Sequence, residues 1–327
     1  MSRERKSRPT TRRRVVRPWQ VLAHGDVIDV VAPASKCPPE RLAAGLAVLR
    51  EWGYVPRVPP DLFADTPLVA NTEAVRWQHL RRALTAPDSA AVWCVRGGYG
   101  CLHMLGHIAR MRMPGRSKPV LGFSDVTALQ LALWHLWGWP GLHAPVVAQL
   151  GDGSVSERDL KSLRGLLDGS VGELSLGRLR RVAGRADAAP SETIAGPLYG
   201  GNLTTLMTLL GGAVKPAAGG CIVFFEDVNE RGYSVDRMLR MLENAGTFRR
   251  ARAVVLGEFL RAEEPGGETM IPAAFSNLAE RLRCPVFAGL PIGHGRRLPP
   301  LVIGAPATLT DRGNGWSLDY RVGTSAR

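Results

Sequence analysis

Short apolar runs that stop abruptly at polar residues alternate along the chain with segments of helical periodicity. Residues 26–33, 90–95 and 119–123 are runs typical of strands, whereas residues 39–52 carry apolar side chains at helical spacing. The run at 90–95 is nearly continuous, which is typical of a strand buried on both faces of a parallel sheet. This alternation predicts an α/β fold with an open parallel sheet that binds its ligand at the carboxyl edge.

The sharpest of these transitions lies at Ser124 and Asp125. The apolar run 119–123 stops at this pair, and beyond it apolar residues recur at helical spacing as far as Trp137, so the pattern predicts strand, tight turn and helix. A serine on the first turn of a helix lies near unpaired backbone N–H groups that can stabilise an oxyanion. Serine and aspartate are also favoured helix N-caps, and position alone does not separate the two interpretations.

The second half of the chain repeats the alternation and adds two more polar residues directly after apolar runs. Glu226 ends the run 220–227 together with Asp227, and His294 stands between two glycines after the run 285–287. We expect a basic disordered arm (1–18), a nucleophile-bearing α/β domain (19–150), a linker or peripheral excursion (151–195) and a C-terminal α/β domain that carries Glu226 and His294 (196–320).

Charge is concentrated at the start of the chain. The net charge of the 327 residues is +13, and residues 1–18 contribute +7 of it through eight basic residues and one glutamate. The remainder has no basic and aromatic stripe, so nucleic-acid binding is not expected. No sustained apolar stretch follows Arg12 to Arg14 and no window approaches 18 apolar residues, which disfavours export and membrane insertion.

Five scattered cysteines are an odd number without a C-x-x-C pair or a histidine at ligand spacing. They fit buried thiols in a reducing compartment better than disulfides or a zinc site. Cys94 and Cys101 flank the glycine-rich stretch 97–100, so a cysteine nucleophile is an alternative there. That stretch lacks the Walker A pattern, and it is better suited to bringing backbone N–H groups close to a ligand.

Ser124, Glu226 and His294 form a charge-matched set for nucleophilic catalysis. A hydroxyl nucleophile needs an imidazole that takes its proton, and the imidazole needs an acceptor that fixes its tautomer. His294 is equally compatible with a turn, and Glu226 with an arginine partner downstream. Spacing does not decide a triad, and five other histidines compete for the role of base: His24, His103, His107, His135 and His143.

Several sequence blocks together resemble the L,D-carboxypeptidase family, which includes cytoplasmic muropeptide carboxypeptidases and microcin C immunity-type hydrolases. The resemblance covers about residues 20–310. The blocks that carry it are residues 95–100, 122–125, 200–203, 225–227, 236–239, 256–259 and 291–295. The basic arm has no counterpart in this resemblance.

The resemblance implies a cytoplasmic, homodimeric serine peptidase with Ser124 as nucleophile, Glu226 as orienting acid and His294 as base. It places the oxyanion hole at backbone amides of Gly97 or Gly98 and of Asp125, and it implies neither a metal nor another cofactor. Recognition of a terminal carboxylate calls for cationic or amide donors, for which Arg96, Asn202 and Arg231 are candidates by their chemistry.

The substrate implied by the resemblance is a muropeptide tetrapeptide that loses its terminal D-amino acid during peptidoglycan recycling. An alternative within the family is hydrolysis of a peptidyl- or aminoacyl-nucleotide amide, for which Trp137 and Trp139 are candidate stacking residues. An alternative of another class is a ligand-binding protein without catalysis. The presence of Ser124, Glu226 and His294 argues against this last interpretation.

Overall fold

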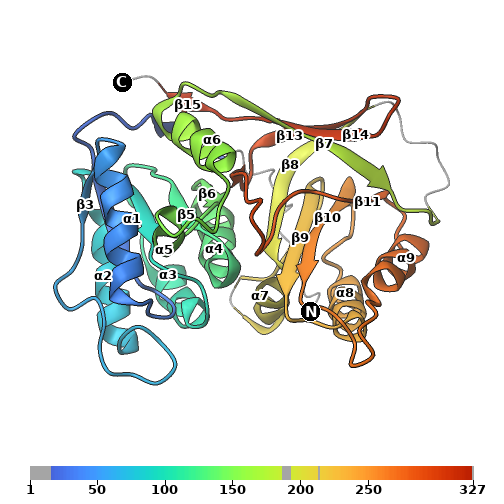
Figure 1. The fold of residues 1–327 in the computed structure, drawn as a ribbon, viewed down its shortest axis with the longest axis horizontal. Helices are drawn as coiled ribbons and strands as arrows, with labels where there is room; N and C mark the ends of the chain where they lie inside the picture. Colours follow the sequence, from blue (N-terminus) through green and yellow to red (C-terminus); the bar gives the residue numbers. More distant parts are fainter. Residues whose placement is uncertain (1–15, 186–192, 213, 326–327) are drawn as a thin grey trace, which may run out of the picture.

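A computed structural model describes residues 16–185, 193–212 and 214–325 of the chain. The described residues form two halves that lie side by side, an N-terminal half built on an open sheet and a C-terminal half built on a barrel (Figure 1). None of the helices in these ranges is both long enough and apolar enough to span a membrane. The predicted α/β class with two α/β units is confirmed.

The N-terminal half contains a six-stranded sheet in the order β12-β6-β5-β4-β2-β3. Its five N-terminal strands run parallel, and the sixth, β12, is antiparallel and comes from the far end of the chain. The strands are β2 (Val27–Val31), β3 (Val55–Arg57), β4 (Ser89–Cys94), β5 (Val120–Gly122), β6 (Gly141–His143) and β12 (Leu301–Val302). All six residues of β4 are buried, as its continuous apolar run predicts.

Helices cover both faces of this sheet. Right-handed crossovers place the helices that follow β3, β4 and β5 on one face and the helix that follows β2 on the other, because the chain changes its direction across the sheet after β3. The helices of this half are α1 (Pro39–Glu51), α2 (Glu73–Thr85), α3 (Leu105–Arg110), α4 (Thr127–Trp137) and α5 (Val147–Leu150), with 3₁₀ turns at Cys101–Met104 and Ser124–Val126.

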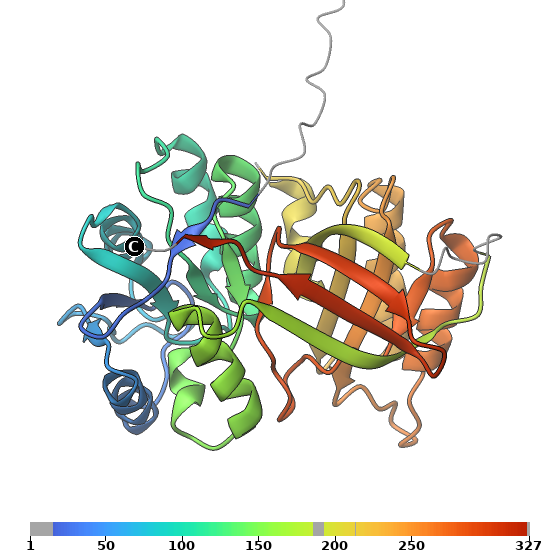
Figure 2. The same cartoon turned by 90° about the horizontal axis from the view of Figure 1, so that it is seen from above.

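The C-terminal half is a closed barrel in the order β10-β11-β7-β14-β13-β8-β9 (Figure 2). Closure pairs every strand on both sides, so the barrel has no free edge. The strands are β7 (Glu173–Arg181), β8 (Thr193–Asn202), β9 (Ile222–Val228), β10 (Ala253–Leu260), β11 (Val286–Ala288), β13 (Pro306–Asp311) and β14 (Trp316–Arg321). The helices are α7 (Leu203–Thr208), α8 (Gly232–Asn244) and α9 (Ile271–Arg281), with a 3₁₀ turn at Leu209–Gly211.

Residues 151–195, expected to be a linker or peripheral excursion, contain a helix and a barrel strand. Helix α6 (Glu157–Asp168) buries Leu163, Leu166 and Leu167, and β7 pairs with both β11 and β14. Strand β7 escapes recognition in the sequence because only two of its nine residues are buried, so polar side chains dominate its pattern. The C-terminal barrel therefore begins before residue 196.

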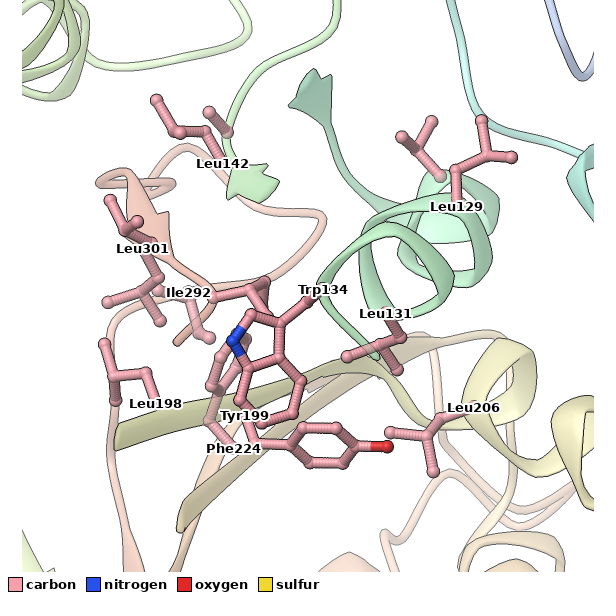
Figure 3. Close-up of a cluster of buried hydrophobic side chains, with 14 of the residues drawn as sticks. Leu129, Leu131, Trp134, Leu142, Leu198, Tyr199, Leu206, Phe224, Ile292 and Leu301 are labelled. Carbon is pink, nitrogen blue, oxygen red and sulfur yellow. The ribbon is translucent and has the colours of Figure 1, made fainter. Parts of the chain in front are cut away.

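The two halves share one hydrophobic core. Figure 3 shows side chains of α4 packed against residues of β8 and β9, with Ile292 and Leu301 beside them. The rings of Trp134 and Tyr199, which belong to different halves, lie 5.6 Å apart. A second link joins the chain ends, because β1 (Trp19–Gln20) pairs with β15 (Thr324–Ser325). Residues at the boundary between the halves are therefore held by packing from both sides.

Candidate active site

Ser124 occupies a strained turn between β5 and α4. Its φ of 60° lies in the left-handed region, which costs a residue other than glycine about 1–3 kcal/mol. The preceding Gly122 is also required, since a Cβ at that position would come within 2.9 Å of the Val126 side chain. Such a strand-to-helix turn exposes the serine side chain at the carboxyl edge of the sheet, as the nucleophile elbow of α/β-hydrolases does.

The glycine-rich loop after β4 lies directly against this serine. A Cβ at Gly97 would be 2.9 Å from Ser124 Cβ and 3.2 Å from Ser124 Oγ, so only glycine permits the approach. Gly98 has a φ of 98° and packs equally closely on Ser35. The backbone of this loop therefore runs beside the hydroxyl, and Asp125 follows Ser124 in the 3₁₀ turn that starts the helix.

Glu226 and His294 form a buried pair in the other half. The distance from His294 Nδ1 to Glu226 Oε2 is 2.8 Å, and the glutamate is fully buried while the imidazole side chain is 16% exposed. A carboxylate only accepts hydrogen bonds, so Nδ1–H donates and Nε2 is left as the acceptor. This is the tautomer that a general base requires.

The ring of His294 connects this pair to the serine. It lies 4.7 Å, centroid to centroid, from the ring of Phe123, the residue that precedes Ser124. The structure thus places the Glu226–His294 pair next to the turn that carries Ser124, at the boundary between the halves. Ser124 Oγ has no hydrogen-bond partner within the described ranges, and such contacts commonly tighten only when substrate binds.

The cysteine alternative does not fit the structure. Cys94 and Cys101 are completely buried, and burial raises the pKa of both thiols, which disfavours the reactive thiolate. Cys101 instead helps to fix the serine turn, because its N–H donates to the buried Asp125 carboxylate at 2.8 Å. In the part of the chain that the structure describes, no group of three His, Cys, Asp or Glu side chains is placed to hold a metal ion.

The three candidate carboxylate-binding residues have different surroundings. Arg96 is exposed beside Gly97 and uses one guanidinium nitrogen on the Lys36 carbonyl, at 2.9 Å. Arg231 stacks over the Tyr233 ring, 4.9 Å from its centroid, and lies 3.7 Å from a Glu264 oxygen. Arg96 is the direct neighbour of Gly97, which packs against Ser124.

Asn202 has mainly internal contacts. It caps α7, where its Oδ1 accepts from the N–H of Thr205, and its Nδ2 donates to Asp227 Oδ1 at 2.9 Å. Asp227 follows Glu226 directly, and its second oxygen accepts from Thr204. Asn202 therefore fixes the end of β9, which carries the glutamate.

Two further residues lie beside the site: His143, one of the histidines that the sequence offers as a base, and Glu258, to which the sequence analysis assigns no role. His143 is completely buried, edge-on to Phe123 and to Phe224, and burial lowers its pKa to about 4. Glu258 packs on the glycines that flank His294, since a Cβ at Gly295 would lie 2.5 Å from Glu258 Oε2. Glu258 is a polar residue directly after an apolar run, the same signal that identifies Glu226.

Two family models match the chain in order. The model of the LD-carboxypeptidase N-terminal domain matches residues 28–144, and that of the LD-carboxypeptidase C-terminal domain matches residues 195–309. A putative carboxypeptidase of Streptomyces coelicolor is 35% identical over 305 residues, which cover 91% of this chain and 94% of that protein. The murein tetrapeptide carboxypeptidase of Pseudomonas aeruginosa is 32% identical over 272 residues, which cover 82% and 88%.

Solved structures agree with these matches. The muramoyltetrapeptide carboxypeptidase from Oxalobacter formigenes is 28% identical and has a TM-score of 0.78, with 91% of this chain and 100% of that chain covered. The microcin C7 self-immunity protein MccF in complex with aspartyl sulfamoyl adenosine has a TM-score of 0.79 at 20% identity, covers 94% and 99%, and shows the shared fold alone. This chain therefore belongs to the LD-carboxypeptidase family and is a peptidase.

Proposed function

We propose that this protein is a serine carboxypeptidase that releases the terminal D-amino acid from muropeptide tetrapeptides through Ser124, His294 and Glu226. The observation that carries the proposal is the buried Glu226–His294 pair, 2.8 Å apart, next to a serine held at positive φ. The relatives named as murein tetrapeptide carboxypeptidases support the substrate class. The five free thiols fit a reducing compartment such as the cytoplasm, where such peptides would be recycled.

Acylation follows from the tautomer of His294. Its Nε2 takes the proton of the Ser124 hydroxyl as Oγ attacks the carbonyl carbon of the L-configured residue. Glu226 keeps Nδ1 protonated and stabilises the imidazolium that forms, and its complete burial strengthens that interaction. The imidazolium then gives its proton to the amine of the departing D-amino acid, and the acyl group remains on Ser124.

Charge on the tetrahedral intermediate requires donors beside Ser124. We assign this role to backbone N–H groups of Gly97 or Gly98 and of Asp125, because the loop packs against the Ser124 side chain and Asp125 is the next residue of the turn. In deacylation His294 takes a proton from water, the hydroxide attacks the acyl carbon, and Ser124 recovers its proton as the peptide leaves.

The terminal carboxylate of the substrate needs a cation near the leaving group. We assign Arg96 to this role, since its guanidinium is exposed beside the glycine-rich loop. Asn202 acts through Asp227 as a positioning residue, and Arg231 contacts a more distant part of the peptide.

The first test is Ser124→Ala. With a tetrapeptide that ends in D-Ala, we expect kcat/KM to fall by about 10³-fold or more, because the nucleophile is lost. D-Ala release is measured by mass spectrometry, and circular dichroism checks the fold. Ser162→Ala is the matched control, because that hydroxyl lies exposed on α6 and contacts only a backbone carbonyl of its own helix. Undiminished release by Ser124→Ala would end the proposal.

A nucleotide-bearing substrate is the second arm of the same test. Trp137 and Trp139 are buried in the core, with their rings 5.3 Å apart, so neither offers an open face to a nucleobase. We therefore expect little hydrolysis of an aminoacyl sulfamoyl adenosine under conditions in which the tetrapeptide is cleaved. Preferential cleavage of the nucleotide substrate would instead assign the chain to the other branch of its family.

A further inference from the structure

Buried Arg76 ties together the loops at the carboxyl edge of the N-terminal sheet. The side chain is 2% exposed and projects from α2. Its Nε donates to the carbonyl of Asn71 at 2.9 Å, and Nη1 donates to the carbonyls of Gly100, at 3.0 Å, and Pro33. No carboxylate of the described residues forms an ion pair with this guanidinium. Arg76 is therefore a buried cation whose hydrogen bonds go to backbone carbonyls and to an imidazole, while the carboxylates of Glu73 and Asp125 act on it only from beyond ion-pair distance.

The remaining nitrogen of Arg76 fixes the tautomer of His103. Nη2 of the arginine lies 2.8 Å from His103 Nδ1. A guanidinium has donors only, so Nδ1 must accept and carries no proton, and the ring hydrogen is on Nε2. The arginine thus determines in which direction the imidazole donates.

His103 in turn determines the orientation of the Tyr99 hydroxyl. Its Nε2 is 3.1 Å from the phenolic oxygen, and the two rings meet edge-on at 5.1 Å. Because Nε2–H donates, the oxygen of Tyr99 accepts and its own hydrogen must point elsewhere. The tyrosine is 48% exposed, and no other acceptor for this hydrogen is found within the described ranges. The chain of hydrogen bonds runs from the buried Arg76 guanidinium through His103 to the exposed Tyr99 hydroxyl. Each bond polarises the next one, so the hydroxyl becomes a stronger donor.

This donor lies on the rim of the candidate active site. Tyr99 belongs to the loop whose Gly97 touches Ser124, and its N–H donates to Ser35 Oγ at 3.2 Å. His103 lies on the 3₁₀ turn that begins at Cys101, whose N–H is bonded to Asp125. Both ends of the Tyr99–His103 contact are therefore anchored to residues that adjoin the serine.

We propose that Tyr99 donates a hydrogen bond to a carboxylate of the bound peptide, with His103 and Arg76 as positioning residues behind it. This inference rests on the peptidase function proposed above. A carboxylate is the favoured acceptor because the donor is polarised by a guanidinium that forms no ion pair within the described ranges, and because Arg96 adds a second cation to the same loop.

The first experiment is Tyr99→Phe, which removes the hydroxyl and keeps the ring. We expect KM for the tetrapeptide to rise about tenfold or more, with kcat changed less than threefold, because the lost bond serves binding rather than chemistry. Tyr54→Phe is the control, since that buried tyrosine adjoins the amino end of β3, at the opposite edge of the sheet. A KM within twofold of the wild-type value would overturn the proposal.

A double-mutant cycle tests the role of His103. If the imidazole acts only through the phenol, His103→Phe raises KM in the wild-type chain but adds nothing in the Tyr99→Phe background. Independent, multiplicative effects on KM would overturn the positioning role. Substrates in which each carboxylate is replaced in turn by a carboxamide identify the acceptor, because the Tyr99→Phe penalty disappears for one of them. Persistence of the penalty with every substrate would overturn the carboxylate assignment.

The outcome is separable from failure of the peptidase function. If the wild-type chain releases no D-Ala, the proposed function fails. If it releases D-Ala at a normal rate and Tyr99→Phe behaves like the control, only the present inference fails. Calorimetric binding of the uncleaved tetrapeptide to Ser124→Ala, with and without Tyr99→Phe, gives the same comparison without turnover, and we expect about tenfold weaker binding in the double variant.

Discussion

At the scale of single residues, Ser124 can occupy its position because two neighbouring residues are glycines and have no Cβ atom. Gly97 leaves room for the serine side chain, and Gly122 leaves room for the start of α4. Ser124 itself is held in a conformation that costs free energy, which the surrounding packing must offset. The geometry is thus sensitive to a single added methyl group.

Gly97→Ala tests this sensitivity. The new Cβ would lie 2.9 Å from Ser124 Cβ, so the loop or the serine must move, and a displacement of this size at a reacting centre costs about 10²-fold in kcat/KM. Steady-state kinetics on the tetrapeptide measures the loss. Gly115→Ala, where the new methyl group meets nothing within 4 Å, is expected to retain wild-type activity. Equal activity of the two variants would show that the loop adapts freely.

His143 predicts a pH dependence of stability. Its pKa falls from 6.5 to about 4 on folding, because burial disfavours the charged imidazolium. Between these values the unfolded chain binds a proton that the folded chain does not. The free energy of unfolding therefore decreases as the pH is lowered through this interval, by about 3 kcal/mol in total, and the contribution is intact at neutral pH.

Replacement by phenylalanine removes the titrating group and keeps an aromatic ring between Phe123 and Phe224. We expect urea unfolding of His143→Phe to be less sensitive to pH between 4 and 6.5 than that of the wild-type chain. Other groups titrate in both proteins, so the quantity compared is the change in the free energy of unfolding with pH, wild type minus variant. If the variant lost as much stability between pH 7 and pH 4 as the wild-type chain does, His143 would not be the cause of the pH dependence.

The sequence predicts individual residues at strand ends better than it predicts their contacts. Ser124, Glu226 and His294 can be nominated because each follows an apolar run, a local signal. The Arg76–His103–Tyr99 chain cannot be predicted in this way, since Arg76 lies on a helix whose pattern gives no sign that it is buried. Its partners are brought together by the packing of separate loops, which a local pattern does not encode.

At the scale of elements, the end of β9 is fixed by the start of α7. The helix cap Asn202 joins the two, because one end of its amide holds the helix and the other holds Asp227. Thr204, in the first turn of α7, donates to the same carboxylate through its N–H and its hydroxyl. Glu226 precedes Asp227, so the cap indirectly supports the residue that we propose as the orienting acid.

Asn202→Ala and Asn202→Ser separate the two functions of this side chain. Alanine loses both, and we expect a decrease of about 1–2 kcal/mol in the free energy of unfolding together with a lower kcat. Serine retains a capping oxygen but not the donor to Asp227, so stability recovers in part while kcat stays low. Urea denaturation and steady-state kinetics give the two readouts. Wild-type kcat in both variants would exclude a positioning role for Asn202.

Elements with a solvated face or few residues are the ones that the pattern misses. Strand β7 has a mixed composition, and β12 contains two residues, yet both complete a sheet or barrel. Their pairing depends on partners more than 100 residues away, β12 with β6 and β7 with β14. By contrast, β4 and the turn into α4 are predicted well, because continuous burial and helical spacing leave a strong local signal.

At the scale of the whole molecule, the loop that carries His294 belongs to the C-terminal half but is anchored to α6. Asp159, in the first turn of α6, accepts from Arg297 Nε at 2.9 Å and from the N–H of Leu298 at 3.0 Å. The N–H of Ser156 donates to the Arg296 carbonyl at 2.9 Å. Beyond the loop, β12 adds to the N-terminal sheet. Helix α6 is therefore bonded to residues 296–298, which follow His294 in the same loop, and we infer that it helps to position the imidazole relative to Ser124.

Asp159→Asn is the most direct test of this coupling. The substitution preserves shape, but it removes a buried charge that pairs with Arg297 and turns one acceptor into a donor that faces other donors. We expect the free energy of unfolding to fall by about 3 kcal/mol and kcat to fall about tenfold or more, because His294, three residues from Arg297, loses its fixed position. Urea denaturation and tetrapeptide hydrolysis measure the two effects.

The control for Asp159→Asn is Glu157→Gln, which removes a negative charge from an exposed position in the same turn of α6. It changes the net charge and the helix N-terminus equally but breaks no contact to the His294 loop, so kcat should remain at the wild-type value. Arg297→Gln, combined with Asp159→Asn, closes a double-mutant cycle. If the ion pair transmits the effect, the second substitution adds little to the first. If the effects of the two substitutions on kcat simply multiplied, the ion pair would not set the position of the imidazole. The shared core and β12 alone would then align the two halves, and the contact with α6 would contribute only stability.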